Sequence, residues 1–356
     1  FTDGAADTTV GTEKKACPAD AAQSCYWVTI TRVVPINLVR LVGFNGDADL
    51  SGGGRGQTVS SLAIASSKFD PSTFCILALA SGGASVTGIE TKGGGGTPFA
   101  GCRLGTNGKA SCNQRQGADS VNASNKPSGC TGTGSADDAK DKVNSSPLED
   151  PYIGLKDKIP PNPCTSYSET KLNAGSTIAL SSLPKTYCGN VSLKGDVSIS
   201  GNGVIIIYNG TLNLSGNKLT SGVGSGVTII FAGSNPSKTV VPNGKGTLDI
   251  AAPKSGDWSG VAIYTDPTNK TLYSYTENGG NSISWNVSGL IYMPYATTTF
   301  NGDVNRATNG LDCFALVVDT FRSNGGVKLL EHQSACAEAG LTPPKGGIAQ
   351  RQALVQ

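Results

Sequence analysis

The chain has 356 residues, enough for one large domain or two ordinary ones, and its 48 glycines with few aromatic (6%) and charged (15%) residues favour an all-β protein with many turns. The formal net charge of +2 gives no reason to expect nucleic acid or an anionic membrane as a partner. No apolar run approaches the roughly 18 residues that a membrane-spanning helix needs.

Ten cysteines and a single histidine, His332, favour a disulfide-bonded protein over a zinc protein. Structural zinc sites place cysteines about two to four residues apart, usually with histidine, whereas the closest pair here is Cys17 and Cys25. An even number of dispersed cysteines is typical of disulfides formed in an oxidising compartment. We therefore expect a protein of the cell surface or the extracellular space, exported through an oxidising periplasm, without a cofactor or a structural metal.

Residues 1–68 are predicted to form a small strand–helix–strand module. CYWVTITRVV, residues 25–34, alternates apolar and polar residues as a strand does, and QTVSSLAIASS, residues 57–67, reads as a second strand. Between them INLVRLVGF, residues 36–44, has apolar residues at helical spacing and a glycine that would end the helix.

The stretch NGDADLSGG, residues 45–53, resembles part of a calcium-binding loop. Oxygen-bearing side chains occupy alternate positions, as the ligands of such a loop do: Asn45, Asp47, Asp49 and Ser51. The sixth position is Leu50 instead of glycine and the twelfth is Gly56 instead of glutamate, so both the sharp turn and the bidentate ligand are missing. A polar turn between the helix and the next strand is the better interpretation.

Residues 69–336 are predicted to form a right-handed parallel β-helix, or β-solenoid. DVSISGNGVIIIYNGTLNLSGN, residues 196–217, shows the pattern: short alternating runs are separated by Gly and Asn, which tolerate turns with φ > 0. Such strands can stack on one another as successive turns of a solenoid. A β-sandwich is the alternative, but its strands would be longer and more evenly spaced. A Gly-, Ser- and Asn-rich insertion at about 103–163 is expected to form surface loops.

The cysteine pairing follows from the predicted solenoid. Because each turn contacts only its neighbours, cysteines close in sequence should pair. The predicted disulfides are Cys17–Cys25, Cys75–Cys102, Cys112–Cys130, Cys164–Cys188 and Cys313–Cys336.

The segment 337–356 is interpreted as a C-terminal tail containing Pro and Gly, and its last residues, 352–356, have a strand-like pattern. This strand could pair with an edge of the N-terminal module. If the module belongs to another copy, head-to-tail contact yields a fibre unless it closes into a ring. If it belongs to the same chain, the protein stays monomeric.

Several long blocks follow one another along the chain: VTITRVVPINLVRLVGF, FCILAL with SVTG, YCGNVSLKGDVSISGNGVIII, SGDWSGVAIYTD, VSGLIYMPYATTTFNG, CFALVVDTF and the closing QALVQ. Together they resemble the extracytoplasmic part of a TadG-like pilus-assembly protein of the tight-adherence (Flp) pilus family. Family members usually carry an N-terminal transmembrane helix and an alanine-rich segment. Neither lies within these residues, so the resemblance leaves the membrane anchoring open.

Carboxylates that could cleave a polysaccharide are thinly spread. Hydrolysis of a glycosidic bond usually needs two close carboxylates, but Asp137 and Asp138 lie in a charged loop, and Asp249, Asp257 and Asp266 fall at different phases of different repeats. We therefore expect a non-enzymatic structural or assembly component of an extracellular appendage, associated with itself or with other pilus or surface proteins. A glycan- or surface-binding adhesin is the alternative, and a polysaccharide-degrading enzyme the third choice.

Overall fold

The computed structural model divides the chain into two units, residues Phe1–Pro71 with Ile348–Gln356 and residues Ser72–Gly347. The predicted tail is thus divided between the units. The structure describes residues 7–16, 24–36, 46–66, 74–92, 99, 102–113, 117–118, 120–125, 127, 129–130, 141–143, 147–234, 240–241, 246–277, 283–301, 304–324, 333–341 and 353–355.

The first unit is an antiparallel sheet in the order β1-β2-β4-β27, with β3 also paired to β4. Its strands are β1 (Thr8–Ala16), β2 (Ser24–Pro35), β3 (Ala48–Asp49), β4 (Arg55–Ser66) and β27 (Ala353–Val355). Sequence alternation located β2 and β4 but not β1. Apart from Ile36, which is not helical, the predicted helix lies outside the described residues.

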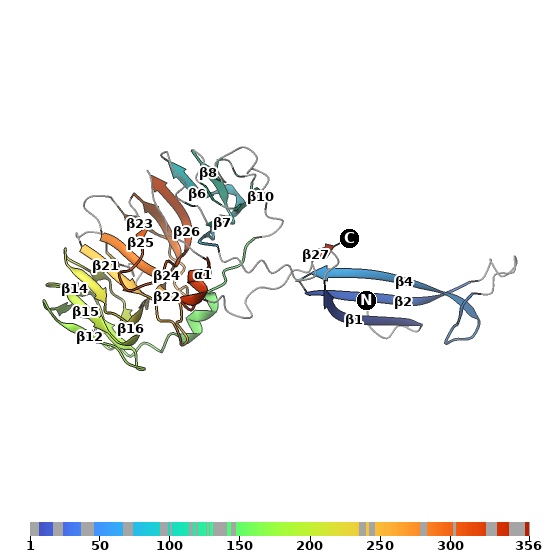
Figure 1. Ribbon diagram of the computed structural model, residues 1–356, viewed down its shortest axis with the longest axis horizontal. Helices are drawn as coiled ribbons and strands as arrows, with labels where there is room; N and C mark the ends of the chain where they lie inside the picture. The colour runs from blue at the N-terminus through green and yellow to red at the C-terminus, as the bar shows by residue number, and fades with distance from the viewer. Residues whose placement is uncertain are drawn as a thin grey trace. The chain divides into compact units, whose positions relative to one another are not determined.

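The second unit is built from short strands that pair in parallel (Figure 1). Its first twelve along the rows are β11 (Thr170–Leu172), β12 (Thr177–Ala179), β13 (Lys185–Cys188), β14 (Val191–Leu193), β15 (Val197–Ser200), β16 (Asn202–Tyr208), β17 (Leu212–Asn213), β18 (Lys218–Ser221), β19 (Gly226–Ala232), β20 (Val240–Val241), β21 (Gly246–Ala251) and β22 (Val261–Thr265). Each strand pairs with the strand three places later, which gives three rows: β11-β14-β17-β20, β12-β15-β18-β21 and β13-β16-β19-β22.

The rows continue through longer strands and then through the N-terminal part of the unit. The remaining elements are β23 (Tyr273–Glu277), β24 (Ile283–Phe300), β25 (Val304–Asn305), β26 (Phe314–Asn324), β5 (Ile76–Ala78), β6 (Thr87–Lys92), β7 (Arg103–Thr106), β8 (Lys109–Cys112), β9 (Ser120–Ala123), β10 (Asp141–Val143) and the helix α1 (Gln333–Glu338). β24 pairs in parallel with β21 and β22, and β26 pairs with β24. β5 and β6 then pair with β26, followed by β7, β8, β9 and β10.

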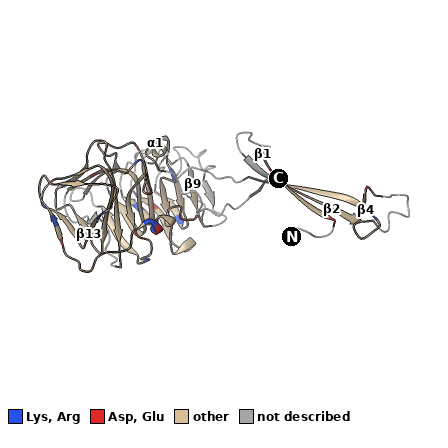
Figure 2. Ribbon diagram, turned by 90° about the horizontal axis from the view of Figure 1, so that it is seen from below, with Lys and Arg blue, Asp and Glu red and all other residues tan. Residues whose placement is uncertain are grey.

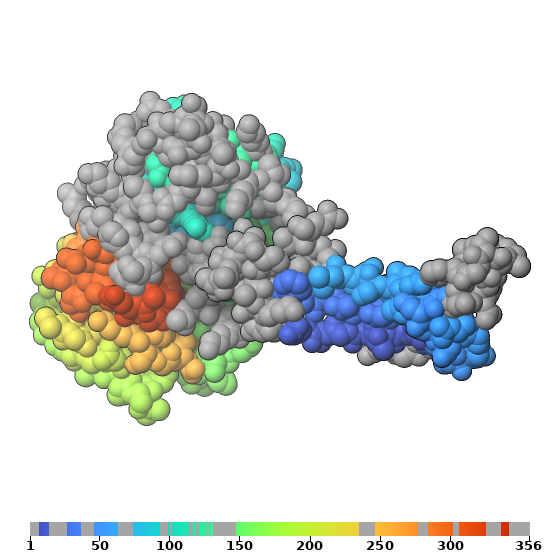
Figure 3. Space-filling model, turned by 45° about the vertical axis from the view of Figure 1, so that its right-hand side comes forward, coloured from blue at the N-terminus to red at the C-terminus, as the bar shows by residue number. Residues whose placement is uncertain are grey.

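The chain is therefore mainly β, as predicted, with a large parallel sheet. The expectation of surface loops over 103–163 is wrong in part, because β7 to β10 extend the rows and Leu104 and Val121 are fully buried. These strands escaped notice because RLGT, KASC and SVNA hold few large apolar residues. Figure 3 shows the surface of the second unit passing from green and yellow through orange to red, as successive strands follow one another along each row.

Aliphatic residues lie opposite one another on neighbouring strands of a row, and their side chains form the core. Ile205 of β16 lies opposite Ile229 of β19, and Ile229 lies opposite Ile263 of β22. All three side chains are buried. Successive strands lie about 4.8 Å apart, so aligned aliphatic side chains contact one another along the row.

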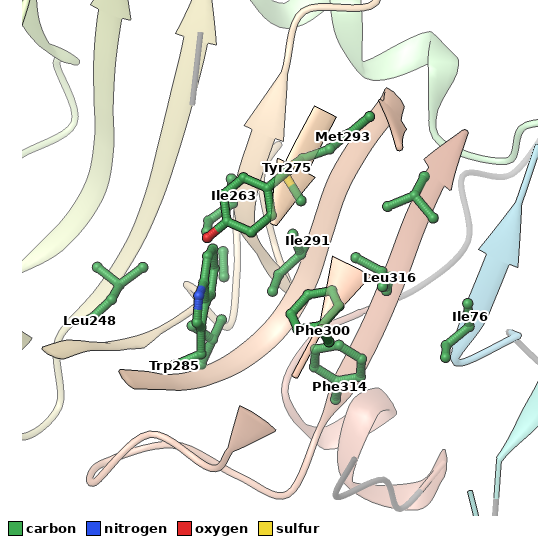
Figure 4. Packing of buried hydrophobic residues seen from close by; sticks show 14 of the residues in the cluster. Ile76, Leu248, Ile263, Tyr275, Trp285, Ile291, Met293, Phe300, Phe314 and Leu316 are labelled. Atoms are coloured by element: carbon green, nitrogen blue, oxygen red, sulfur yellow. The ribbon is translucent and has the colours of Figure 1, made fainter. Parts of the chain in front are cut away.

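Aromatic rings extend the same core toward β26 (Figure 4). Tyr275 contacts Trp285 edge-on with ring centroids 5.8 Å apart, and it also lies 6.5 Å from the ring of Phe300. The ring of Phe321 follows 5.9 Å from Phe300, and Phe99 lies 6.2 Å beyond it. This chain of rings links the middle of the sheet to the N-terminal part of the unit.

A segment running from Leu148 to Ile159 packs against the row β13-β16-β19-β22, on the face opposite the aliphatic core. Tyr264 and Tyr292, opposite each other on β22 and β24, stack with centroids 4.4 Å apart. Tyr292 donates a hydrogen bond of 2.7 Å to the Asp150 carboxylate, and Tyr264 donates one to the Tyr152 carbonyl. Burial raises the pKa of Asp150 above its usual range, although the hydrogen bonds that the carboxylate accepts from Tyr292 and from the backbone of Tyr152 and Ile153 oppose the shift.

Candidate functional site

Four of the five predicted disulfide pairs stand at disulfide distance in the structure. The Cα–Cα separations are 5.5 Å for Cys75–Cys102, 5.1 Å for Cys112–Cys130, 5.7 Å for Cys164–Cys188 and 4.5 Å for Cys313–Cys336. Cys17 lies outside the described residues, as does the side chain of Cys25. Four disulfides indicate folding in an oxidising, exported environment.

The calcium-like loop uses its carboxylates to close a turn. Asp47 accepts hydrogen bonds from the Thr58 backbone (2.6 Å) and the Gln57 side chain (3.0 Å). Asp49 forms an ion pair of 2.9 Å with Arg55. The backbone N–H of Ser51 donates to the Asp7 carboxylate, and Asn45 lies outside the described residues. These partners lie within the first unit, which favours the polar turn over a calcium site.

The described aspartates among those considered for catalysis each have their own partners. Asp257 forms an exposed ion pair of 3.3 Å with Lys158, and Asp266 accepts a hydrogen bond from the backbone of Thr268 in its own turn. Asp137 and Asp138 lie outside the described residues, as does His332. In the described part of the chain, no three His, Cys, Asp or Glu side chains gather as metal ligands would.

Asp249 has a structural role beneath one corner of the rows. Its side chain is 0% exposed and accepts hydrogen bonds from the backbone (2.7 Å) and hydroxyl (2.5 Å) of Thr308, with the Lys218 ammonium 3.1 Å away. Burial alone would raise the pKa of Asp249, but the Thr308 hydrogen bonds and Lys218 outweigh it and hold the pKa below its usual value. The neighbouring Asn309 donates to the carbonyls of Gly222 and Ser225. The segment 307–310 is thereby fastened across several strands.

Unequal corner lengths create a trough along this side of the second unit. Only Gly201 separates β15 from β16, whereas the corner between β12 and β13 spans 180–184 and the corner between β21 and β22 spans 252–260. Gly201 has φ of +82°, and a Cβ there would lie 2.6 Å from the Leu180 carbonyl oxygen, so the short corner requires glycine. The two longer corners stand on either side of this low point.

The trough has two lobes, about 380 Å³ and about 280 Å³, that share Asn202 and Ser255. The larger lobe is lined by the corner 181–184, by Trp258 and by the Lys158–Asp257 pair. The smaller lobe continues past Lys254 to the fastened segment around Asn309. Charged residues are sparse over the second unit (Figure 2), and the trough lining follows that pattern, with hydroxyls, amides and prolines.

Two terminal strand groups bear on assembly. At one end of the rows, β11, β12 and β13 each pair with one strand only. In the first unit, β27 pairs with β4 through Ala353↔Ser66, Leu354↔Ala65 and Val355↔Ile64. The last strand therefore pairs with the N-terminal module of its own chain, which is one of the two alternatives that the sequence leaves open.

The sequence pattern did not predict the trough, nor the contacts of Asp150 with the stacked pair Tyr264 and Tyr292. The corner APKSGDWSG, residues 252–260, is the longest between successive strands from β11 to β22 and carries Lys254, Ser255 and Trp258, so comparing corner lengths would have signalled the trough. VAIYTD and GLIYMPY place tyrosines at matching positions of successive repeats, which could have predicted the stacked pair.

Comparison with models of known families, with curated proteins and with solved structures finds no match. No helix among the described residues is long and apolar enough to cross a membrane.

Proposed function

We propose that the chain is a non-enzymatic structural or assembly component of an extracellular bacterial appendage, and that it is a TadG-like protein associated with the tight-adherence pilus. The block resemblance supports the family, and the disulfides suit an exported protein. The dispersed aspartates, each held by local partners, support a role without catalysis.

The proposal includes the architecture of the second unit as a parallel β-helix whose faces are the three rows. Each strand's pairing with the strand three places later is the connectivity expected of a solenoid with three strands in each turn. A stack of this kind is a stiff, neutral rod, which suits a structural element of an appendage.

The observation that carries the proposal is the end of the rows formed by β11, β12 and β13, which each pair with one strand only; Ser168 N donates to Cys188 O at the last residue of β13, so β12 is the most open of the three. At the two ends of β12, Leu180 N donates to Ser200 O, and Ser198 N donates to Ser176 O. The backbone N–H and C=O groups of the even-numbered residues therefore point toward β15. The backbone groups of Thr177 and Ala179 therefore point to the open side. An unpaired parallel edge is a template for another chain. Because β27 pairs within its own chain, we place self-association at this end of the rows instead of at the tail.

Light scattering and electron microscopy of the purified full chain test self-association. The double variant Thr177→Lys/Ala179→Lys puts two charges on the open strand, where lysines discourage pairing. We expect concentration-dependent end-to-end oligomers of the wild type and their loss in the variant. The matched control Ser198→Lys/Ser200→Lys changes outward residues of the adjacent, already paired strand and should leave the oligomers intact. A wild type that stays monomeric, or oligomers that survive the open-strand variant, would overturn this mode of assembly.

Pilus association is tested in the bacterium that produces the protein. Deletion of the gene should reduce the number of pili seen by electron microscopy, and the wild-type gene should restore it. Normal pili in the deletion strain would overturn the family-specific part of the proposal.

A further inference from the structure

We propose that the trough between the corners 180–184 and 252–260 binds an extended acidic polysaccharide. This inference is independent of the pilus association, because it concerns only residues within the second unit. It also differs from the expected adhesin site, which lay in the 103–163 insertion.

The direction and length of the trough fit a polymer. Its lining passes from the corner after β12, over those after β15, β18 and β21, to Ser288 in the middle of β24. The strands β12, β15, β18, β21 and β24 are successive neighbours in one row. Four spacings of about 4.8 Å give a length of about 19 Å. A chain of several sugar units, lying across the strands, fills such a site better than a single small molecule.

The lining favours a sugar polymer over a peptide. Extended peptides commonly bind by adding a strand to a free sheet edge, but the strands beneath the trough's middle, β15, β18 and β21, are paired on both sides. Recognition therefore falls to side chains. Sugars present both hydroxyl-bearing edges and apolar C–H faces, and the lining offers both complements. Its hydroxyl and amide groups come from Ser181, Ser182, Asn202 and Ser255, and its apolar surface from Pro160, Pro184, Val204 and Trp258.

The charge in the trough favours an acidic polymer. Lys158 and Asp257 neutralise each other at 3.3 Å. Lys254 is exposed beside Ser255, and among the described ion pairs it has no carboxylate partner. An ammonium in a site that otherwise holds neutral hydroxyls attracts the carboxylate of a uronate residue through a charge-assisted hydrogen bond.

The walls of the trough are fixed before a ligand arrives. The Asp249 and Asn309 hydrogen bonds fasten the far wall, and Trp258 packs edge-on against Tyr264 at 5.0 Å. A preformed site loses less conformational entropy on binding. Cleavage is not expected, because Asp257 is the one carboxylate among the lining residues and glycoside hydrolysis usually needs a pair.

Isothermal titration calorimetry on the full chain tests the inference, with polygalacturonate oligomers as the probe and dextran oligomers of similar length as the neutral comparison. We expect the wild type to bind the acidic oligomers and to bind dextran at least about tenfold more weakly, the equivalent of one charge-assisted contact. Binding should weaken as salt is added. Ser255→Trp, which fills the junction of the lobes, should abolish binding, and Lys254→Gln should weaken it about tenfold.

Ser234→Trp is the matched control, because it adds the same ring at an exposed serine after β19, outside the lining of both lobes. Circular dichroism establishes that each variant is folded. Failure of the wild type to bind either oligomer, or unchanged binding by the folded Ser255→Trp variant, would overturn the site. Equal affinity for dextran and polygalacturonate, unaffected by Lys254→Gln, would overturn its acidic specificity.

Discussion

Truncation of Phe321 should cost a large part of the stability of the second unit. The Phe321 ring is fully buried on β26, between Phe300 at 5.9 Å and Phe99 at 6.2 Å. Phenylalanine to alanine changes in packed cores cost about 3–5 kcal/mol. Each ring pair adds about 0.5–1.5 kcal/mol beyond its buried area, so we expect Phe321→Ala to fall in the upper half of that range. This is a substantial share of the about 5–15 kcal/mol that typically holds a domain folded.

Denaturant unfolding with the disulfides intact measures this loss. The control Tyr167→Ala removes a ring that is 46% exposed and should change the unfolding free energy by no more than about 0.5 kcal/mol. Hydrogen exchange adds a local readout: Phe321 lies opposite Ile89 of β6, so amides of β6 should exchange faster in Phe321→Ala. A loss below about 1 kcal/mol, with β6 protected as in the wild type, would refute the stacking of the N-terminal strands on β26.

Three further changes probe the buried polar groups and the disulfides. Asp150→Asn keeps a hydrogen-bond acceptor for Tyr292 but removes the charge. Because the pKa of Asp150 is raised in the folded state, ionisation of Asp150 destabilises the wild type as pH rises above about 4. Melting curves should therefore show the stability of the variant increasing relative to that of the wild type between about pH 4 and pH 7. Asp249→Asn should show the opposite pH dependence. Because the pKa of Asp249 is lowered in the folded state, its carboxylate stabilises the wild type above about pH 4 and this stabilisation is lost below it. The variant should therefore be less stable than the wild type at pH 7, and a stability difference that did not shrink near pH 3 would contradict this. Cys313→Ser/Cys336→Ser opens a link over 23 residues and should cost about 3 kcal/mol in chemical unfolding, whereas an unchanged midpoint would argue against the pair.

The sequence carried the local features of the fold because they depend on neighbouring residues. Alternation predicts strands wherever aliphatic residues are frequent, as in 204–208, and Gly or Asn at a corner predicts where the chain turns. Strands made of small residues, such as β8 and β9, lack that signal although Cys112 and Val121 are buried. Their place in the rows depends on β6 and β7, with which they pair, and β6 in turn pairs with β26, which lies more than 200 residues further along the chain.

The candidate sites show the same division. The pairing of Cys164 with Cys188 follows from proximity in sequence, and the structure has it. Asp249 looked like one more corner aspartate, because its partner Thr308 lies 59 positions away. The trough arises from the difference between corner lengths in strands that stack, so no single segment encodes it.

The order of stacking differs from the order of the chain, and this bears on how the molecule could assemble. Cys75, near the start of the second unit, is held between β26 and β7, since Leu316 N donates to its carbonyl and its own N–H donates to Arg103 O. Near the other end of the unit, Leu341 packs beside Gly260 at the start of β22. Both described ends of the unit therefore join the middle of the rows, while β11, β12 and β13 at one extremity are internal segments of the chain.

The terminal strands β11, β12 and β13 lie at the extremity of the rows, away from the described ends of the unit at Cys75 and Leu341. A terminal strand that pairs on one side only is a template for another chain. Such an edge is costly unless it is used or protected, and the outward residues Thr177 and Ala179 carry no charge to protect it. Lys171 of β11 and Lys185 of β13 flank β12, which itself carries no charge. The uncharged strand β12 is therefore the place to look for assembly, and Thr177→Lys/Ala179→Lys is the change most able to prevent it.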